Sequence, residues 1–93
     1  MSTRRKEPQP ALGRALRELR EGKGLSQEAV ARRTGMHLTG INRLENGRTN
    51  PTWGSIKRVA AALGVSVAEV ANRAEAVEGT KEKAPRRGGP PGG

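Results

Sequence analysis

The segment SQEAVARRTGMHLTGINRLEN, residues 26–46, decides the fold. It divides at Gly35 into two short stretches, and in each of them apolar residues recur at the three- and four-residue spacing of an amphipathic helix. Ser26 is a favourable N-cap for the first stretch, and Gly35 tolerates the positive φ that a tight turn needs. The segment therefore predicts one helix over 27–34 and a second from about residue 37 to residue 45 or 46.

The small and apolar residues of this segment predict that its two helices cross closely. Ala31 lies one turn before Gly35, at the point where a larger side chain would keep the helices apart. The apolar side chains expected between the two helices are Val30, Met36, Ile41 and Leu44. Two short helices joined in this way form a helix-turn-helix unit, whose second helix enters the major groove of duplex DNA.

Capping residues and glycines outside this segment predict three more helices, over residues 10–21, 53–63 and 67–77. Pro10 suits a first helical turn, and Thr52 is a favourable N-cap. Ser66 and Glu69 match the pattern of a capping box. No stretch alternates apolar and polar residues with the period of two that a half-buried strand shows. The predicted fold class is therefore all-α, with residues 10–77 as one domain.

The two ends of the chain are predicted to lie outside this domain. Residues 1–9 are polar and basic and are expected to form a flexible arm. Residues 78–93 are rich in Gly, Pro and basic residues and are expected to form a disordered tail. The basic groups of these segments either follow DNA phosphates or are only solvated; they are Arg4, Arg5, Lys6, Arg86 and Arg87.

The charge of the chain is the first indication of its partner. Eighteen Lys and Arg against nine acidic residues give a net charge of +9. Eleven of the basic residues and five of the glutamates fall in residues 10–73, so the excess lies mainly in the predicted domain. A basic surface attracts DNA phosphates and releases their counterions. The single aromatic residue, Trp53, argues against single-strand and RNA-binding modules, which stack bases on several aromatic side chains.

Composition also argues against several other classes of function. With no Cys and one His, we expect neither a disulfide nor a metal site. The serines of the predicted domain are explained as helix caps or surface residues without a nearby base, so we expect no enzyme and no cofactor. No run approaches the roughly 18 apolar residues of a membrane span, and no secretory signal is seen. A cytoplasmic protein, associated with the nucleoid when bound to DNA, is expected.

Four segments resemble the Cro/C1-type (XRE) family of phage and bacterial repressors. They are LRELREGKGLSQEAVA (16–31), TG (34–35), INRLENGRTNP (41–51) and IKRVAAALGVSVAEV (56–70). Their order and separations match the helices and loops of that family. The resemblance implies a compact five-helix, lambda-repressor-like domain. It also implies a sequence-specific transcriptional regulator, a repressor, that binds double-stranded DNA through the helix at about 37–46.

The resemblance assigns roles to matching positions. Gln27 corresponds to a glutamine that clamps a DNA phosphate, and an ordinary exposed helix-start residue is the alternative. Further phosphate contacts are expected at the end of the second helix of the unit and in the loop after it, from Arg43, Asn46, Arg48 and Thr49. Arg20 and Glu45 match a structural ion pair that is common in the family.

Base reading is expected from the exposed face of the helix at about 37–46, by His37, Leu38, Thr39, Asn42 and Arg43. Asn42 would pair with adenine and Arg43 with guanine, while Leu38 and Thr39 would contact thymine methyl groups. A helix cap or a backbone contact is the alternative for His37. Leu38 and Gly40 depart from the polar residues often found here in the family. Either Gly40 lets the helix approach the bases closely, or the position is undemanding.

The resemblance also implies a homodimer, whose half-sites would lie about one DNA turn apart, roughly 34 Å. Trp53 is expected to pack in the core or at its edge. The alternative is a dimer contact that the valines of the C-terminal region join, Val65, Val67 and Val70. An antitoxin of a toxin-antitoxin pair, or another regulator that binds a protein partner as well as its own promoter, is the alternative function.

Overall fold

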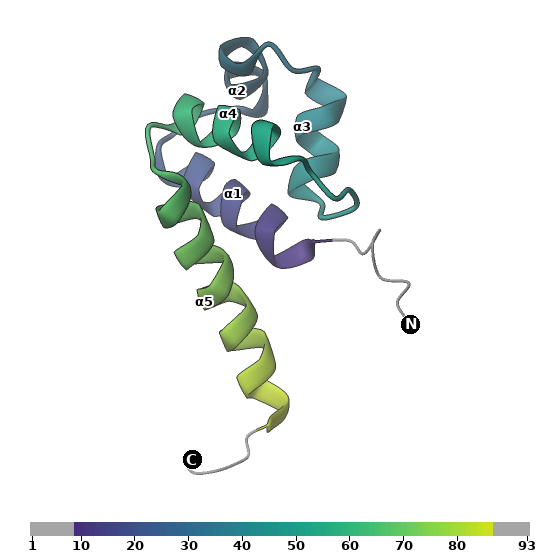
Figure 1. Cartoon of the computed structure of the whole chain (residues 1–93), viewed down its shortest axis with the longest axis vertical. Helices are drawn as coiled ribbons and strands as arrows, with labels where there is room; N and C mark the ends of the chain where they lie inside the picture. Colours follow the sequence, from purple (N-terminus) through teal and green to yellow (C-terminus); the bar gives the residue numbers. More distant parts are fainter. Residues whose placement is uncertain (1–8, 87–93) are drawn as a thin grey trace.

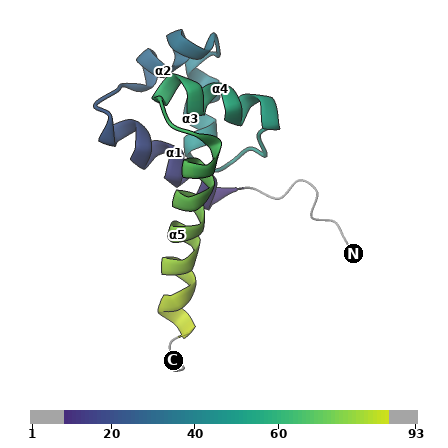
Figure 2. The same cartoon turned by 60° about the vertical axis from the view of Figure 1, so that its left-hand side comes forward.

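The computed structural model describes residues 9–86 of the chain, with side chains as far as residue 79. Five helices make up this part: α1 (Pro10–Gly22), α2 (Gln27–Thr34), α3 (Leu38–Glu45), α4 (Trp53–Leu63) and α5 (Val67–Arg86). No strand occurs between residues 9 and 86, so the all-α prediction is confirmed. The first four helices pack into one bundle, and α5 begins against α1 and then projects away from the bundle (Figure 1, Figure 2).

Capping side chains set the starts of three helices where the sequence predicted them. Ser26 Oγ and Thr52 Oγ1 each accept a hydrogen bond from the backbone N–H three residues on, at 3.0 and 3.1 Å. Ser66 and Glu69 form the expected capping box, with bonds of 3.0 and 3.1 Å between each side chain and the other's N–H. Such a cap stabilises a helix by about 1 kcal/mol. The bounds of α1–α4 accordingly lie within one residue of those predicted.

The last helix is longer than the sequence predicted. Its end was expected at residue 77, but α5 continues to Arg86. Between these positions only Gly79 and Pro85 disfavour a helix, and an isolated glycine costs only about 1 kcal/mol without ending one. The helix end predicted at residue 77 was therefore wrong, and residues 78–86, predicted as the start of a disordered tail, are helical. Residues 1–8 of the predicted arm and 87–93 of the tail lie outside the described residues.

The core lies where the five helices meet. Its largest fully buried side chains come from four of them: Leu16, Ile41, Val30 and Val70 are each 1% exposed. Leu63 of α4, at 3%, completes the set. Burying one such side chain stabilises the fold by roughly 1.5–3 kcal/mol. The predicted apolar faces of the helices thus point inward.

The start of α1 passes very close to the end of α3. A Cβ at Gly13 would overlap the carbonyl oxygens of Leu44 and Glu45, so no larger residue fits this position without a shift of the backbone. Gly47, the second residue after α3, meets Pro10 in the same way. These two contacts fix the end of α3, which carries Glu45, against the helix that carries Arg20.

Trp53 does not pack in the core or at its edge, as the sequence predicted. It is 62% exposed and stands outside the group of half-buried residues that pack against the core. The reason is its place in the first turn of α4, where the apolar stripe of that helix reaches the core only from Ile56 onward. Of the valines named beside Trp53 for a dimer contact, Val70 is buried in the core.

Candidate nucleic-acid interface

The turn between α2 and α3 is fixed by a few short-range hydrogen bonds. Gly35 adopts φ +77°, which favours glycine, and its N–H donates to the carbonyl oxygen of Ala31 at 2.9 Å. Thr34 Oγ1 donates to the carbonyl oxygen of Val30 at 2.8 Å and accepts from the N–H of Met36 at 3.1 Å. These bonds hold the turn in place, and α3 lies against α2 with its outer face uncovered.

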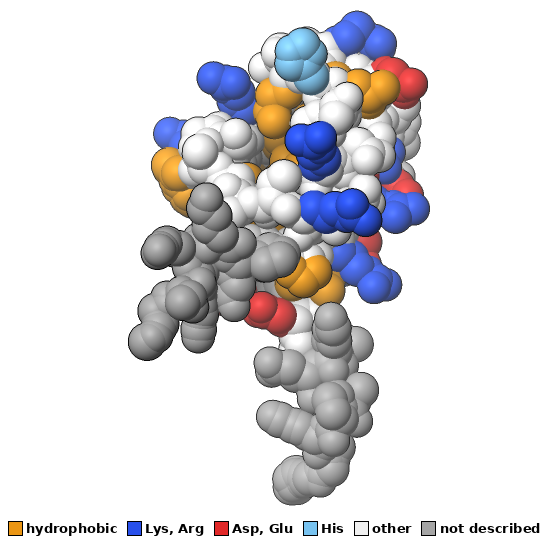
Figure 3. Space-filling model, turned by 90° about the vertical axis from the view of Figure 1, so that its right-hand side faces the viewer, with side chains coloured by type: hydrophobic (Ala, Val, Ile, Leu, Met, Phe, Trp, Pro, Cys, Tyr) orange, Lys and Arg blue, Asp and Glu red, His pale blue; other side chains and the backbone are white. Residues whose placement is uncertain are grey.

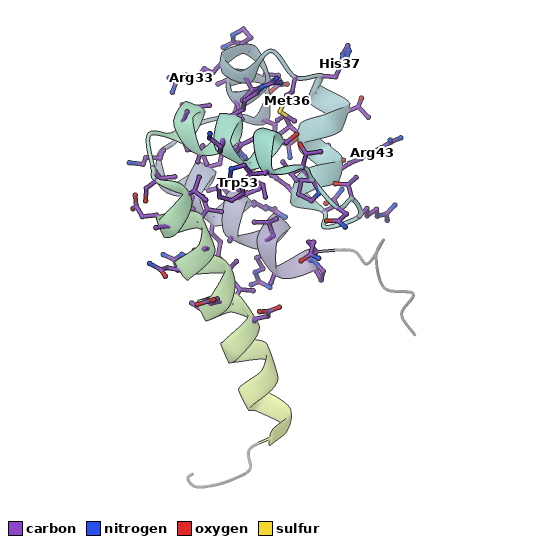
Figure 4. The ribbon with its side chains drawn as sticks, viewed as in Figure 1. Arg33, Met36, His37, Arg43 and Trp53 are labelled. Carbon is purple, nitrogen blue, oxygen red and sulfur yellow. The ribbon has the colours of Figure 1, made fainter. Side chains whose placement is uncertain are left out.

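The outer face of α3 forms one side of the molecule. All the residues predicted to read bases are exposed there: His37, Leu38, Thr39, Asn42 and Arg43. His37 and Arg43 both point away from the bundle on this side, whereas Arg33 lies on the opposite side (Figure 4). There Arg33 Nη1 donates to the carbonyl oxygen of Ala62 at 3.0 Å and ties α2 to α4.

His37 occupies the N-cap position of α3, but its side chain does not cap the helix. Its imidazole is exposed, and its backbone carbonyl accepts from the N–H of Ile41 at 3.1 Å. Leu38, the next residue, is 42% exposed, and in the described part of the chain only Trp53 is another large apolar side chain with such exposure. The start of α3 therefore presents an imidazole and an apolar side chain on the outer surface.

Arg20 and Glu45 form the pair that the resemblance implies. Arg20 Nε donates to Glu45 Oε2 at 2.6 Å and Arg20 Nη2 donates to Glu45 Oε1 at 3.0 Å. The two side chains are only 11% and 5% exposed. The hydrogen bonds to Glu45 raise the pKa of the Arg20 guanidinium above its usual value, although burial lowers it. Arg20 Nη1 also donates to the carbonyl oxygen of Leu25 at 2.7 Å, so the ion pair joins α1, the loop before α2 and the end of α3.

Gln27, the first residue of α2, is bound to the same carboxylate. Its Nε2 donates to Glu45 Oε1 at 2.9 Å, and its Oε1 accepts from Asn42 Nδ2 at 3.5 Å. Asn42 Oδ1 in turn accepts from Asn46 Nδ2 at 3.1 Å. We call Gln27, Asn42 and Asn46 the amide chain. The contact between Asn42 and Asn46 has the four-residue spacing of a helix pair, but nothing in the sequence indicated the contact between Asn42 and Gln27.

Arg43 and Arg48 supply positive charge beside the amide chain. Both side chains are exposed, and neither pairs with a carboxylate within residues 9–79. The N–H of Arg48 donates to the carbonyl oxygen of Arg43 at 3.2 Å, and Thr49 is half-buried next in the loop. Figure 3 faces the side of the molecule on which α3 lies and shows blue basic side chains spread over it, with the pale blue histidine at its upper end.

The described part of the chain contains neither a cluster of metal ligands nor a membrane-spanning helix. No three His, Cys, Asp or Glu side chains of that part come together as the ligands of a metal ion would. None of its helices combines the length and the apolar character needed to cross a membrane.

An uncovered helix, set against a second short helix by a three-residue turn and flanked by amide and guanidinium groups, defines a helix-turn-helix DNA-binding domain. The chain belongs to the family described as "Helix-turn-helix domain", which it matches over residues 11–72. The predicted membership among Cro/C1-type regulators is confirmed, and so is the function of a DNA-binding transcriptional regulator.

Its relatives include regulators from several bacteria. The chain is 42% identical over 59 residues to the HTH-type transcriptional regulator y4dJ of Sinorhizobium fredii, a match that covers 63% of this chain and 77% of the relative. The clp gene regulator ClgR of Corynebacterium glutamicum is 32% identical, with a TM-score of 0.75 over 84% of this chain and 86% of that one.

Two restriction-modification controller proteins have the same fold. C.AhdI of Aeromonas hydrophila is 36% identical, with a TM-score of 0.64, and the match covers 66% of this chain and 92% of that one. C.Esp1396I is 22% identical, with a TM-score of 0.68 over 73% of this chain and 90% of that one, and its structure is a tetramer in complex with its natural 35 base-pair operator. At that identity C.Esp1396I shows the fold alone.

Proposed function

We propose that this regulator lays α3 in the major groove of an operator while the start of α2 and the end of α3 hold the adjacent phosphates. The observation that carries the proposal is the position of Gln27. Its amide is fixed by Glu45 at the N-terminus of α2, beside the uncovered face of α3. A helix N-terminus favours an anion, and one N–H of this amide is left to donate to a phosphate oxygen.

The other phosphate contacts come from the end of α3 and the loop after it. Arg43 and Arg48 are exposed and unpaired within the described residues, so phosphate binding costs them no existing ion pair. Asn46 is the C-cap residue of α3, and Thr49 follows in the loop after it. Neutralising phosphates in this way makes binding strongly dependent on salt.

Base reading falls to the start of the exposed face of α3. Arg43 has the donors to pair with guanine O6 and N7, and Leu38 and Thr39 offer methyl groups to thymine. His37 stands at the helix start with an exposed ring that caps nothing. These contacts are few, so the discrimination between sequences rests on a small number of side chains.

Gly40 lies between these side chains, and within the protein nothing requires a glycine there. A Cβ added at Gly40 would have no heavy atom within 4 Å apart from its own neighbours. The helix tolerates the glycine at a cost of about 1 kcal/mol relative to alanine. We attribute the glycine to close approach of α3 to the base edges, the first of the two explanations given above.

The regulator is proposed to act as a homodimer on a two-fold symmetric operator and to repress transcription there. Trp53 leaves a large apolar surface exposed in the single chain, and a two-fold interface places such a patch against its own copy. The tetramer of C.Esp1396I on its operator gives a precedent within the fold. The proposal involves no catalysis and no cofactor. The antitoxin alternative, with a toxin as partner, stays a prediction.

Selection of bound sequences from a random duplex library, at near-physiological salt, tests the proposal. We expect one enriched motif with two-fold symmetry and half-sites about 34 Å apart. Failure to enrich any motif, with binding that vanishes as salt rises, would reduce the function to charge-driven contact with DNA.

Three single variants then test the placement of the interface. Gln27→Ala and Arg43→Ala should each weaken binding to the selected duplex by at least about fivefold, and Arg43→Ala should also reduce the slope of log K against log salt by about 1. Arg73→Ala, which removes an exposed charge from α5, is the matched control and should bind like the parent. Parental binding by both Gln27→Ala and Arg43→Ala, with the fold intact, would refute the proposed interface.

A further inference from the structure

Asn42 lies at the centre of the amide chain, and both ends of its side chain have protein partners. Its Nδ2 donates to Gln27 Oε1 at 3.5 Å, and its Oδ1 accepts from Asn46 Nδ2 at 3.1 Å. An asparagine that reads adenine uses the same two groups together, the carbonyl as acceptor and the amide as donor. Both groups of Asn42 are therefore already engaged within the protein, and each keeps one further N–H or lone pair.

The two partners of Asn42 are both proposed phosphate ligands on different helices. Gln27 begins α2, and Asn46 is the C-cap residue of α3. The side chain of Asn42 connects the two ligands by hydrogen bonds. The other end of the Gln27 amide, Nε2, donates to Glu45 Oε1 at 2.9 Å. The row of bonds starts at the buried Arg20–Glu45 pair and ends at the exposed Asn46.

We infer that Asn42 is a positioning residue, which holds the amides of Gln27 and Asn46 ready for the DNA backbone rather than reading a base. This inference rests on the proposed function. A long amide side chain loses rotamer freedom when it binds, and ordering it beforehand reduces that cost. Because every duplex presents the same phosphates, the gain applies to all sequences alike.

This role predicts how Asn42→Ala changes binding. Affinity for the selected operator and for an unrelated duplex should fall by the same factor, roughly three- to tenfold, which is the range of one neutral hydrogen bond. The ratio of the two affinities, and the motif enriched from a random library, should be those of the parent. Asn72→Ala, which removes an exposed asparagine from α5, is the matched control and should leave both affinities unchanged.

A double-mutant cycle separates positioning from a general effect on the fold. In the Gln27→Ala background the Asn42→Ala change should cost less against the operator than it does in the parent, because one of the two ligands that Asn42 positions is gone. The melting temperature of the Asn42→Ala variant should match that of the parent, since Asn42 is exposed.

The inference would be overturned by an altered base preference at one position of the motif, by a loss confined to the operator, or by additive losses in the cycle. Parental binding by Asn42→Ala would overturn it as well. If Gln27→Ala weakens DNA binding as expected, the proposed function stands whatever the result for Asn42. If Gln27→Ala binds like the parent, the proposed function is itself in conflict with the result.

Discussion

Gly13 and Gly40 are both glycines inside helices, but their surroundings are opposite. A Cβ at Gly13 would overlap the backbone at the end of α3, whereas a Cβ at Gly40 would meet open space. Gly13→Ala should therefore lower the free energy of unfolding by roughly 1–3 kcal/mol, the usual cost of overpacking. Gly40→Ala should raise it by about 0.5–1 kcal/mol, because alanine restricts the unfolded chain and favours the helix.

Chemical denaturation of the two variants, followed by circular dichroism, measures both changes. The two changes in the free energy of unfolding need not be equal in size, but they should have opposite signs. A stabilised Gly13→Ala variant would mean that α1 and α3 do not approach each other as described. DNA binding by Gly40→Ala gives a separate result: weaker binding would support close approach to the bases, and parental binding would favour an undemanding position.

Arg20 and Glu45 support both the fold and the site. Arg20→Ala should cost about 3 kcal/mol, because it leaves the Glu45 carboxylate buried without its partner. The melting temperature of a domain of this size should then fall by roughly 10 °C or more. Thermal unfolding followed by circular dichroism measures this loss. A loss below about 1 kcal/mol would show that the pair is exposed in solution.

The double variant Arg20→Met with Glu45→Leu separates the two roles of the pair. It removes both charges and should recover most of the lost stability, since apolar pairs often replace buried ion pairs without cost. It should still bind DNA weakly, because Gln27 then lacks the carboxylate that orients its amide. Recovery of both properties would show that Glu45 does not position Gln27.

Single residues also show how far sequence reasoning reaches. Gly35 and the capping residues were predictable because their conformations follow from local chemistry, and the resemblance implied the contact between Arg20 and Glu45. The tight packing at Gly13 was not predictable, since it depends on the backbone of a helix about thirty residues further along the chain. The contact of Asn42 with Gln27 depends likewise on how α2 and α3 cross.

Among the elements, α1–α4 were predicted within one residue because a capping residue, a proline or a glycine marks nearly every end. The end of α5 was missed because Gly79, a residue of this kind, does not end the helix. Half-buried Val77 is the last apolar residue of the chain apart from alanine and proline. Beyond it, α5 has no large apolar side chain to bury.

Ending the chain after residue 79 should therefore leave the melting temperature within about 2 °C of the parent. The removed part contributes helix propensity but no large apolar burial. Val70→Ala is the contrasting change at the start of α5, where the side chain is 1% exposed, and it should cost roughly 1–3 kcal/mol. A large loss of stability in the shortened chain would show that residues 80–93 pack on the domain.

Within the described residues, exposed basic side chains without a carboxylate partner lie beside α3, at Arg43 and Arg48, and also elsewhere, at Lys23, Arg32, Lys57 and Arg58. On α1 the exposed arginines Arg14 and Arg17 pair with Glu18 and Glu21, each at 3.2 Å, so that their fields are largely cancelled. Arg43 and Arg48 have no such partners within the described residues. The exposed guanidinium groups of Arg43 and Arg48 attract DNA phosphates to the α3 side, and this attraction raises the association rate at low salt.

Trp53 gives a direct measurement of self-association, because the chain has one tryptophan and no tyrosine or phenylalanine. The side chain is 62% exposed in the single chain, so its fluorescence there should resemble that of tryptophan in water. If a second copy covers it, the emission should shift to shorter wavelength as the protein concentration rises, in step with dimer formation seen by sedimentation.

Trp53→Lys places a charge in this contact and should give a monomer at concentrations where the parent is a dimer. The monomer should keep the parental circular dichroism spectrum, because Trp53 contributes little to the core. It should bind a single half-site like one parental subunit but lose the tighter binding to the full operator, since the second half-site is then no longer bound from a linked subunit. A Trp53→Lys protein that remains a dimer would place the two-fold interface on another face. A parent that stays monomeric on the full operator would remove the dimer from the proposed function.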